Sequence, residues 1–218
     1  MDNKHAFWQA FVIAVIIFMA GIMLGIVFEN SRTSKLEGFY RSSETEIFDV
    51  QLTGNLLANT LNFDCSTALE ENIKFAERIY QEARTLEKYD ESNKITEDII
   101  NIHKKYDLLR TMLWINMIEF QKKCPKETNT VVYLYQYIEP SIEIQAKQNT
   151  MSKIILELKK KYGDKVILIP IAYDTDVASL NLLKARYEIK EFPVVIINQE
   201  YKTTKLSTLE ELEKYMIL

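Results

Sequence analysis

Apolar and polar positions follow three successive patterns along the chain. Residues 6–28 are almost uninterruptedly apolar, with Gln9 as the only polar side chain. From residue 34 to residue 123, apolar side chains recur at helical spacing. After residue 129, short β-branched runs alternate with amphipathic stretches. These patterns predict a membrane-spanning helix, a helical middle region and an α/β C-terminal region.

The first segment is long enough to cross a bilayer. A helix over residues 6–28 reaches roughly 35 Å at about 1.5 Å per residue. A cleaved signal peptide would have a shorter apolar region and a small-x-small cleavage site, whereas Glu29 and Arg32 follow here. We therefore expect a tail at residues 1–5 and a single-pass membrane anchor at residues 6–28. Basic residues flank both ends, so the positive-inside rule does not decide the orientation.

Small residues in this segment offer a packing face. Gly21 and Gly25 form a GxxxG pattern, and Ala14 lies a heptad before Gly21 on the same face. Two such helices could approach closely, which makes a homodimer in the membrane one hypothesis. The alternative is that glycine is simply common in transmembrane helices.

Residues 29–63 are expected to form a helical juxtamembrane spacer. Their apolar positions keep roughly helical spacing, broken by Gly38 and Gly54. Such a helix would hold the distal part of the chain away from the bilayer or pair with a second copy.

Residues 64–128 are expected to form a helical hairpin. Thr67 and Glu70 make a capping box at the start of its first helix, which runs to about residue 89. A polar turn at residues 90–93 then leads into a second helix over residues 94–123.

The chain has two cysteines, Cys65 and Cys124. In an antiparallel hairpin they lie at the start of the first helix and the end of the second, so we expect a disulfide between them. Two isolated buried thiols are the alternative. A disulfide is typical of oxidising compartments, which favours a soluble part outside the cytoplasm.

The C-terminal region predicts elements in the order β-α-β-α-β-β-α. The expected strands lie at 131–137, 166–172, 194–198 and 201–205, and the expected helices at 141–162, at 176–187 and from Ser207 onward. Ser207 and Glu210 form a capping box for the last helix. This order implies a mixed α/β fold in which parallel strands are joined by crossovers and an antiparallel hairpin lies at the sheet edge.

Residues 181–197 carry the most specific signal in this region. An amphipathic helix leads through Tyr187 and Ile189 to Phe192-Pro193 and a β-branched run. The stretch resembles the helix, cis-proline turn and following strand of the thioredoxin superfamily, and the resemblance covers about residues 129–218. It implies a thioredoxin-like fold with the family's cis-proline at Pro193. Val194 stands where the family usually has threonine.

The redox motif of that family is missing here. Cys-x-x-Cys belongs between the first strand and the first helix, where residues 137–143 contain no cysteine. Thiol–disulfide exchange needs a thiolate, so the domain is expected to be redox-inactive by itself. The resemblance still implies a peptide-binding groove, with ordinary loop and scaffold roles for its residues as the alternative. Its floor would be Phe192 and Pro193, and its opposite wall Tyr137, Ile138 and Pro140.

Composition narrows the range of chemistry. The formal net charge is -4 and the sequence pI is about 5.4, so no basic surface dominates and nucleic acid is not expected as a partner. His5 and His103 stand far apart, so neither a metal site nor Ser-His catalysis is expected, and no cofactor is implied. Asp174 and Asp176 follow a strand end, where sites of α/β proteins often lie, although an Asp there can equally cap the next helix.

These features favour a membrane-anchored, non-enzymatic thioredoxin-like protein that binds proteins or peptides, or acts as a scaffold, at the cell envelope. One alternative is a thiol-disulfide oxidoreductase, or an accessory to one, that uses Cys65 and Cys124. Another is a structural membrane oligomer that depends on Gly21, Gly25 and the spacer helix.

Overall fold

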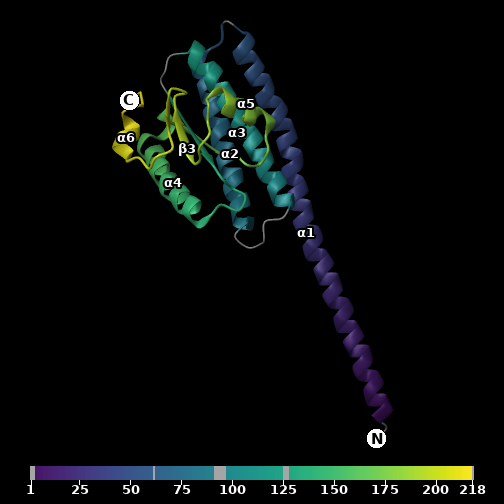
Figure 1. The fold of residues 1–218 in the computed structure, drawn as a ribbon. Helices are drawn as coiled ribbons and strands as arrows, with labels where there is room; N and C mark the ends of the chain where they lie inside the picture. Colours follow the sequence, from purple (N-terminus) through teal and green to yellow (C-terminus); the bar gives the residue numbers. More distant parts are fainter. Residues whose placement is uncertain (1–2, 61, 91–96, 125–127, 218) are drawn as a thin grey trace. The chain divides into compact units, whose positions relative to one another are not determined.

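The computed structural model describes residues 3–60, 62–90, 97–124 and 128–217, with the backbone alone at residues 3–6, 29–44, 46, 85–90 and 98. The chain divides into two compact units, residues 1–47 and residues 48–218. The helices are α1 (Asn3–Asn59), α2 (Cys65–Asp90), α3 (Glu97–Lys123), α4 (Ile142–Tyr162), the 3-10 turn η1 (Gly163–Lys165), α5 (Ala178–Arg186) and α6 (Leu209–Glu213). The strands are β1 (Asn129–Tyr135), β2 (Val166–Ala172), β3 (Val194–Ile197) and β4 (Tyr201–Thr203) (Figure 1).

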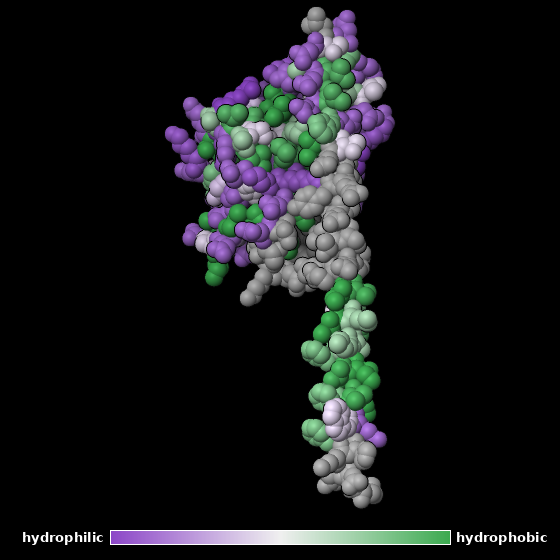
Figure 2. All heavy atoms as spheres, turned by 90° about the vertical axis from the view of Figure 1, so that its right-hand side faces the viewer, coloured by the Kyte–Doolittle hydropathy of each residue, from purple (hydrophilic) through white to green (hydrophobic). Residues whose placement is uncertain are grey.

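Helix α1 is continuous, so Gly38 and Gly54 do not interrupt it. A glycine costs only about 1 kcal/mol in a helix interior, which is too little to end a helix that continues on both sides. In the first unit, Phe7–Phe28 is long and apolar enough to cross a membrane, judged by length and composition. The side chains of this segment are exposed and form a largely green surface in Figure 2. The predicted N-terminal apolar helix is therefore confirmed.

In the second unit, the end of α1 packs against α3. Val50 and Leu57 are buried, and the amide of Asn116 on α3 donates to the Val50 carbonyl oxygen over 3.3 Å. A Cβ atom at Gly54 would collide with the Asn116 side chain. Glycine at this position thus permits the close approach of the two helices.

Helix α2 begins earlier than the sequence predicts, because Asp64 caps it. The Asp64 carboxylate accepts hydrogen bonds from the backbone N–H of Thr67 at 2.9 Å and from the hydroxyls of Thr67 and Ser66. These hydrogen bonds lower the pKa of Asp64 to about 2, and the bond from the Thr67 hydroxyl has the largest effect. The predicted cap at Thr67 is therefore wrong: the neighbouring aspartate is a stronger acceptor and starts the helix at Cys65. The predicted turn at 90–93 and the predicted start of the next helix at 94 fall largely on residues 91–96, outside the described residues.

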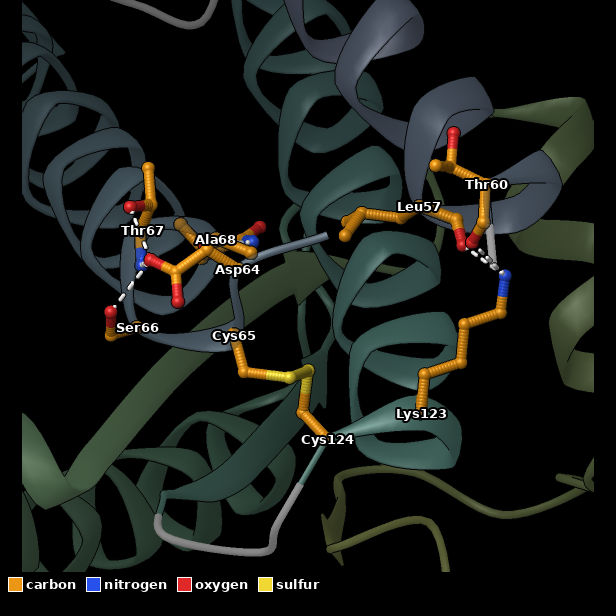
Figure 3. Close-up of a disulfide and its surroundings, with 10 residues drawn as sticks. Leu57, Thr60, Asp64, Cys65, Ser66, Thr67, Ala68, Lys123 and Cys124 are labelled. Carbon is orange, nitrogen blue, oxygen red and sulfur yellow. Dashed lines mark hydrogen bonds between the residues drawn. A yellow bond between two sulfur atoms is a disulfide. The ribbon is translucent and has the colours of Figure 1, made fainter. Parts of the chain in front are cut away.

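The ends of three helices are fastened at one point, shown in Figure 3. Cys65 at the start of α2 forms a disulfide with Cys124, directly after α3, with a Cα–Cα distance of 5.7 Å. The ammonium of the preceding residue, Lys123, donates to carbonyl oxygens at the end of α1, including Ala58 at 2.8 Å and Thr60 at 3.2 Å. We call this arrangement of Cys65, Cys124 and Lys123 the helix clasp.

Four strands form one mixed sheet in the order β2-β1-β3-β4. β1 and β2 are parallel, as a crossover through α4 requires. β3 runs antiparallel to β1 and pairs with β4 in an antiparallel hairpin. The mixed α/β order is as predicted, but the parallel arrangement covers one strand pair only. The connection through α5 returns the chain in the opposite direction.

Helices cover both faces of the sheet (Figure 1). On one face, Val131 and Tyr133 of β1 pack against Met151 and Ile155 of α4. On the other face lies α3, whose fully buried Trp114 donates its indole N–H to Gln199 in the β3–β4 turn over 3.1 Å. The α2–α3 hairpin is thus part of the same compact unit as the sheet.

The last helix also begins at a different residue from the one predicted. Thr208 is its N-cap and forms a capping box with Glu211, one residue beyond the predicted pair of Ser207 and Glu210. Both pairs satisfy the capping pattern in sequence, and the structure selects the second.

Removing the disulfide should destabilise the second unit. The bond closes a loop between residues 59 positions apart, so the Cys65→Ser/Cys124→Ser variant should lose about 4 kcal/mol of unfolding free energy on the chain-entropy model. Urea unfolding of the full chain in detergent, followed by circular dichroism, measures this. Reductant should destabilise the native chain similarly and leave the double variant unchanged. Equal stability of both proteins would contradict the assigned role of the bond.

Candidate functional site

The carboxyl ends of β1 and β2 meet at one edge of the sheet, because the two strands are parallel. Asp174 lies just beyond β2 and reaches the loop that follows β1. Its carboxylate accepts hydrogen bonds from the backbone N–H of Tyr137 at 3.0 Å and of Ile138 at 2.7 Å. This carboxylate therefore holds the two loops together. We call this edge, with residues 137–140, 173–174 and 192–193, the loop edge.

Aromatic stacking fixes two side chains of the loop edge. Tyr173 stacks on Phe192 with ring centroids 3.7 Å apart and an interplanar angle of 11°. The Lys184 ammonium lies 5.6 Å from the Tyr173 ring centroid and 5.9 Å from that of Phe192, and it donates to the Tyr173 carbonyl oxygen at 3.2 Å. Burial lowers the pKa of Lys184, and Asp174 and Asp176 oppose that effect. The half-buried amine of Lys184, from α5, thus lies beside the stacked rings of the loop edge.

Helix α3 also supports the loop edge. The His103 ring stacks on Tyr137 with centroids 3.8 Å apart. One turn further along the helix, Asp107 is fully buried. Its two oxygens accept hydrogen bonds from the Ala172 backbone N–H at 2.9 Å and from the Thr175 hydroxyl at 2.8 Å. Asp107 therefore fixes the end of β2 and the start of the loop that carries Asp174.

The charge on Asp107 is poorly compensated. Burial raises the pKa of its carboxyl group, while the Arg110 guanidinium, 3.6 Å away, and the two hydrogen bonds act in the opposite direction. A buried carboxylate with these partners is a strong structural link between α3 and β2. Its removal would leave the Ala172 N–H without its acceptor and the Thr175 hydroxyl with only the Ala172 carbonyl oxygen, at 3.3 Å.

The structure places the predicted groove residues around Tyr173 and Asp174. Phe192 of the predicted floor contacts Tyr173, and Tyr137 and Ile138 of the predicted wall donate to Asp174. The consecutive residues Tyr173 and Asp174 therefore link the predicted floor to the predicted wall. Pro193 is buried, and the Phe192–Pro193 peptide bond is cis, as the family resemblance implies. The predicted groove as a binding site remains a prediction. Half-buried side chains at the loop edge are Tyr137, Ile138, Pro140 and Phe192.

The contacts that form the loop edge are not visible in the sequence. Asp174 is not a helix cap, because Val177 is the N-cap of α5 and has no side-chain cap bond. Tyr173, Lys184 and His103 belong to three different elements, and only the folded chain brings them to one place. The sequence does single out Asp174, since it follows a strand end, but it does not show that Asp174 binds the loop after β1.

The described residues of the loop edge limit the chemistry that they can supply. Residues 136–141 contain no cysteine, and both cysteines of the chain are in the disulfide. Among the described residues, no group of three or more His, Cys, Asp or Glu side chains is placed to hold a metal ion. The groups present are the stacked rings of Tyr173 and Phe192 and the half-buried amine of Lys184.

The predicted packing residues of the apolar helix are exposed. Ala14 is exposed, and a Cβ atom at Gly21 or Gly25 would meet nothing within 4 Å. Self-association through this face stays a prediction.

Replacing Asp107 tests its linking role. Asp107→Ala should lower the unfolding free energy by about 3–5 kcal/mol, because the Ala172 N–H loses its acceptor, Thr175 loses the closer of its two acceptors, and Arg110 keeps an unpaired buried charge. Asp176→Asn is the control, since its exposed side chain has one long ion contact, to Lys104 at 3.9 Å. Chemical unfolding of the full chain measures both variants, and a small effect of Asp107→Ala would contradict the assignment.

The pH dependence follows from the raised pKa of Asp107. A raised folded-state pKa stabilises the fold below the unfolded value of about 3.9, and this stabilisation is lost as pH rises through the folded pKa. As pH falls from the folded-state pKa to about 3.9, the unfolding free energy of the native chain should therefore increase relative to that of Asp107→Asn. A flat difference curve would contradict the assigned pKa direction.

Comparisons with known proteins leave the family open. No family model and no curated protein matches the chain. One solved structure, titled "Structure of a malarial protein", is similar at 16% sequence identity, over 41% of this chain and 99% of its own, with a TM-score of 0.32. At this TM-score the likeness carries no argument about fold or function.

Proposed function

We propose that the chain is a single-pass membrane protein whose C-terminal part, residues 129–218, is a thioredoxin-like domain that binds polypeptide segments without redox chemistry. The loop edge carries this proposal. Its rings and backbone groups are held in place by Asp174 and α3, and it contains no thiol.

The thioredoxin-like assignment has two supports. The elements follow in the order β-α-β-α-β-β-α around a mixed sheet. Pro193 directly precedes β3, where the family resemblance expects its proline. The residues that the family uses for electron transfer are replaced by 137–143, so this part of the chain keeps a recognition surface and lacks the nucleophile.

The disulfide fits a structural role better than a redox one. Cys65 and Cys124 lie at the ends of the α2–α3 hairpin, where Cys124 is buried and Cys65 is half-buried. A buried sulfur is poorly accessible to an attacking thiolate. These features support the binding function over the oxidoreductase alternative.

The same bond supports a location for the soluble part. Phe7–Phe28 supports a single-pass anchor, and a structural disulfide is stable in an oxidising compartment. We therefore place residues 48–218 outside the cytoplasm in this proposal. A homodimer through Gly21 and Gly25 is compatible with it but is not required.

An exposed apolar side chain adjoins the loop edge. Ile142, the first residue of α4, is 87% exposed and lies two residues after Pro140. Ile138 in the preceding loop is half-buried. Ile142 and Ile138 thus offer apolar contact area beside the ordered loop, which a bound segment would cover. The expected occupant is therefore an extended, apolar polypeptide segment.

Binding of a permanently unfolded protein tests this function. The full chain in lipid nanodiscs should bind fluorescently labelled, reduced and carboxymethylated α-lactalbumin saturably. Ile138→Asp and Ile142→Asp should each weaken binding about tenfold or more, because a charge replaces apolar contact area. Fluorescence anisotropy gives the dissociation constants.

Leu206→Asp is the matched control. Leu206 is a comparable exposed apolar residue, at 53% exposure, and lies outside the loop edge. Its replacement should leave the dissociation constant unchanged. Equal binding by all variants, or equal loss in the control, would refute the loop edge as the binding site.

A further inference from the structure

A separate groove lies between α2, α3, α4 and β2, away from the loop edge. Its cavity volume is about 350 Å³, within the range of ligand sites. Side chains from all four elements form an apolar lining. The apolar floor is formed by Ile73, Ala76, Ile79, Leu113, Leu156 and Leu168.

The groove runs along β2, which is an edge strand of the sheet. The backbone groups on this edge are nevertheless not free to pair with a further strand. The Ala172 N–H already donates to Asp107, and the Val166 carbonyl oxygen accepts from the Lys159 ammonium at 2.9 Å. Pro170 between them has no N–H to offer. Three positions of one strand edge are thus taken or blocked, which disfavours an extended peptide as the occupant.

One buried cation lines the groove. Arg110 is only 7% exposed, and its ion contact is Asp107 at 3.6 Å, beyond normal hydrogen-bond length. Both Asp107 oxygens already accept bonds from Ala172 and Thr175. Among the described residues, the side-chain partner found for Arg110 is Asp107, and the buried side-chain atom left without a hydrogen-bond partner is Ser179 Oγ. The Arg110 nitrogens that make no hydrogen bond are therefore accessible from the groove. A buried guanidinium has five donors, so an acceptor in the groove would satisfy it.

The other charges of the groove are less buried. The Lys159 ammonium is engaged by the Gly163 and Val166 carbonyl oxygens, and the Asp164 side chain is 84% exposed. Lys160 and Glu77 are exposed. Arg110 is therefore the charge that a buried ligand head would meet.

We propose that this groove binds a long-chain fatty acid. Its carboxylate would accept hydrogen bonds from the Arg110 guanidinium, and its hydrocarbon chain would lie on the apolar floor. The positive charge of Arg110 favours a ligand with an anionic head group. Because the edge of β2 cannot pair with a further strand, a hydrocarbon chain, which forms no hydrogen bonds, fits the groove better than a peptide. The site shares no residue with the loop edge, so its test is independent of the peptide-binding function.

Photolabelling of the full chain in nanodiscs tests the site. The probe is palmitic acid with a diazirine in its chain, and labelled peptides are identified by mass spectrometry. Label is expected on peptides that contain residues 73–80 and 156–170, in competition with unlabelled palmitate. Ala76→Trp fills the groove and should lower this labelling about tenfold. Peptide 7–28 should be labelled equally in every variant and serves as the internal standard.

Ala146→Trp is the matched control, because Ala146 is an exposed alanine of α4 outside the groove. It should label like the native chain. The corresponding diazirine alcohol, which has no charge for Arg110, should label the groove about tenfold less than the acid. This comparison uses the native chain and so does not depend on the folding of an Arg110 variant. Labelling confined to peptide 7–28, equal labelling by acid and alcohol, or unchanged labelling of Ala76→Trp would each overturn the proposal.

Discussion

The disulfide between Cys65 and Cys124 is the constraint on which the second unit depends. It joins the start of α2 to the end of α3, and the neighbouring Lys123 binds the carbonyl oxygens at the end of α1. A cross-link over this loop removes many conformations from the unfolded chain. Three helix ends are fixed at one point, which positions α3 across the sheet.

Helix α3 then serves both candidate sites. Its side chains Leu109, Leu113 and Trp114 are fully buried in the apolar contact between the α2–α3 hairpin and the sheet. Towards the loop edge, α3 provides His103 and Asp107, which order the segments after β1 and β2. Towards the groove, it provides Arg110 and Leu113. The helix clasp thus fixes the support of two chemically different surfaces.

The parts that sequence reasoning predicts best are those with a strong local pattern. The apolar segment at 6–28 and the strand at 166–172 are predicted closely, because an uninterrupted apolar run and a β-branched run leave few alternatives. Helix starts are less certain, since Asp64 and Thr67, or Ser207 and Thr208, satisfy the same capping rule. The cysteine pair is found because hairpin geometry brings the two helix ends together.

The candidate sites are harder to predict because long-range contacts create them. Asp107 and Arg110 look like polar positions of a solvated helix face, and only the packing of α3 on β2 buries them. The stacking of Tyr173 on Phe192 joins segments from two strand ends. Phe192 and Pro193 are suggested by the family resemblance, while Lys184 carries no local signal.

We propose a membrane-anchored protein whose oxidised helix clasp lies outside the cytoplasm. A membrane-impermeant maleimide applied to intact cells, with and without prior reduction, tests side and oxidation state together. The proposal predicts that Cys65 and Cys124 gain label only after reduction. Label without reductant would contradict the structural disulfide. No label until the membrane is permeabilised, with a denatured and reduced sample labelling fully, would contradict the extracytoplasmic location.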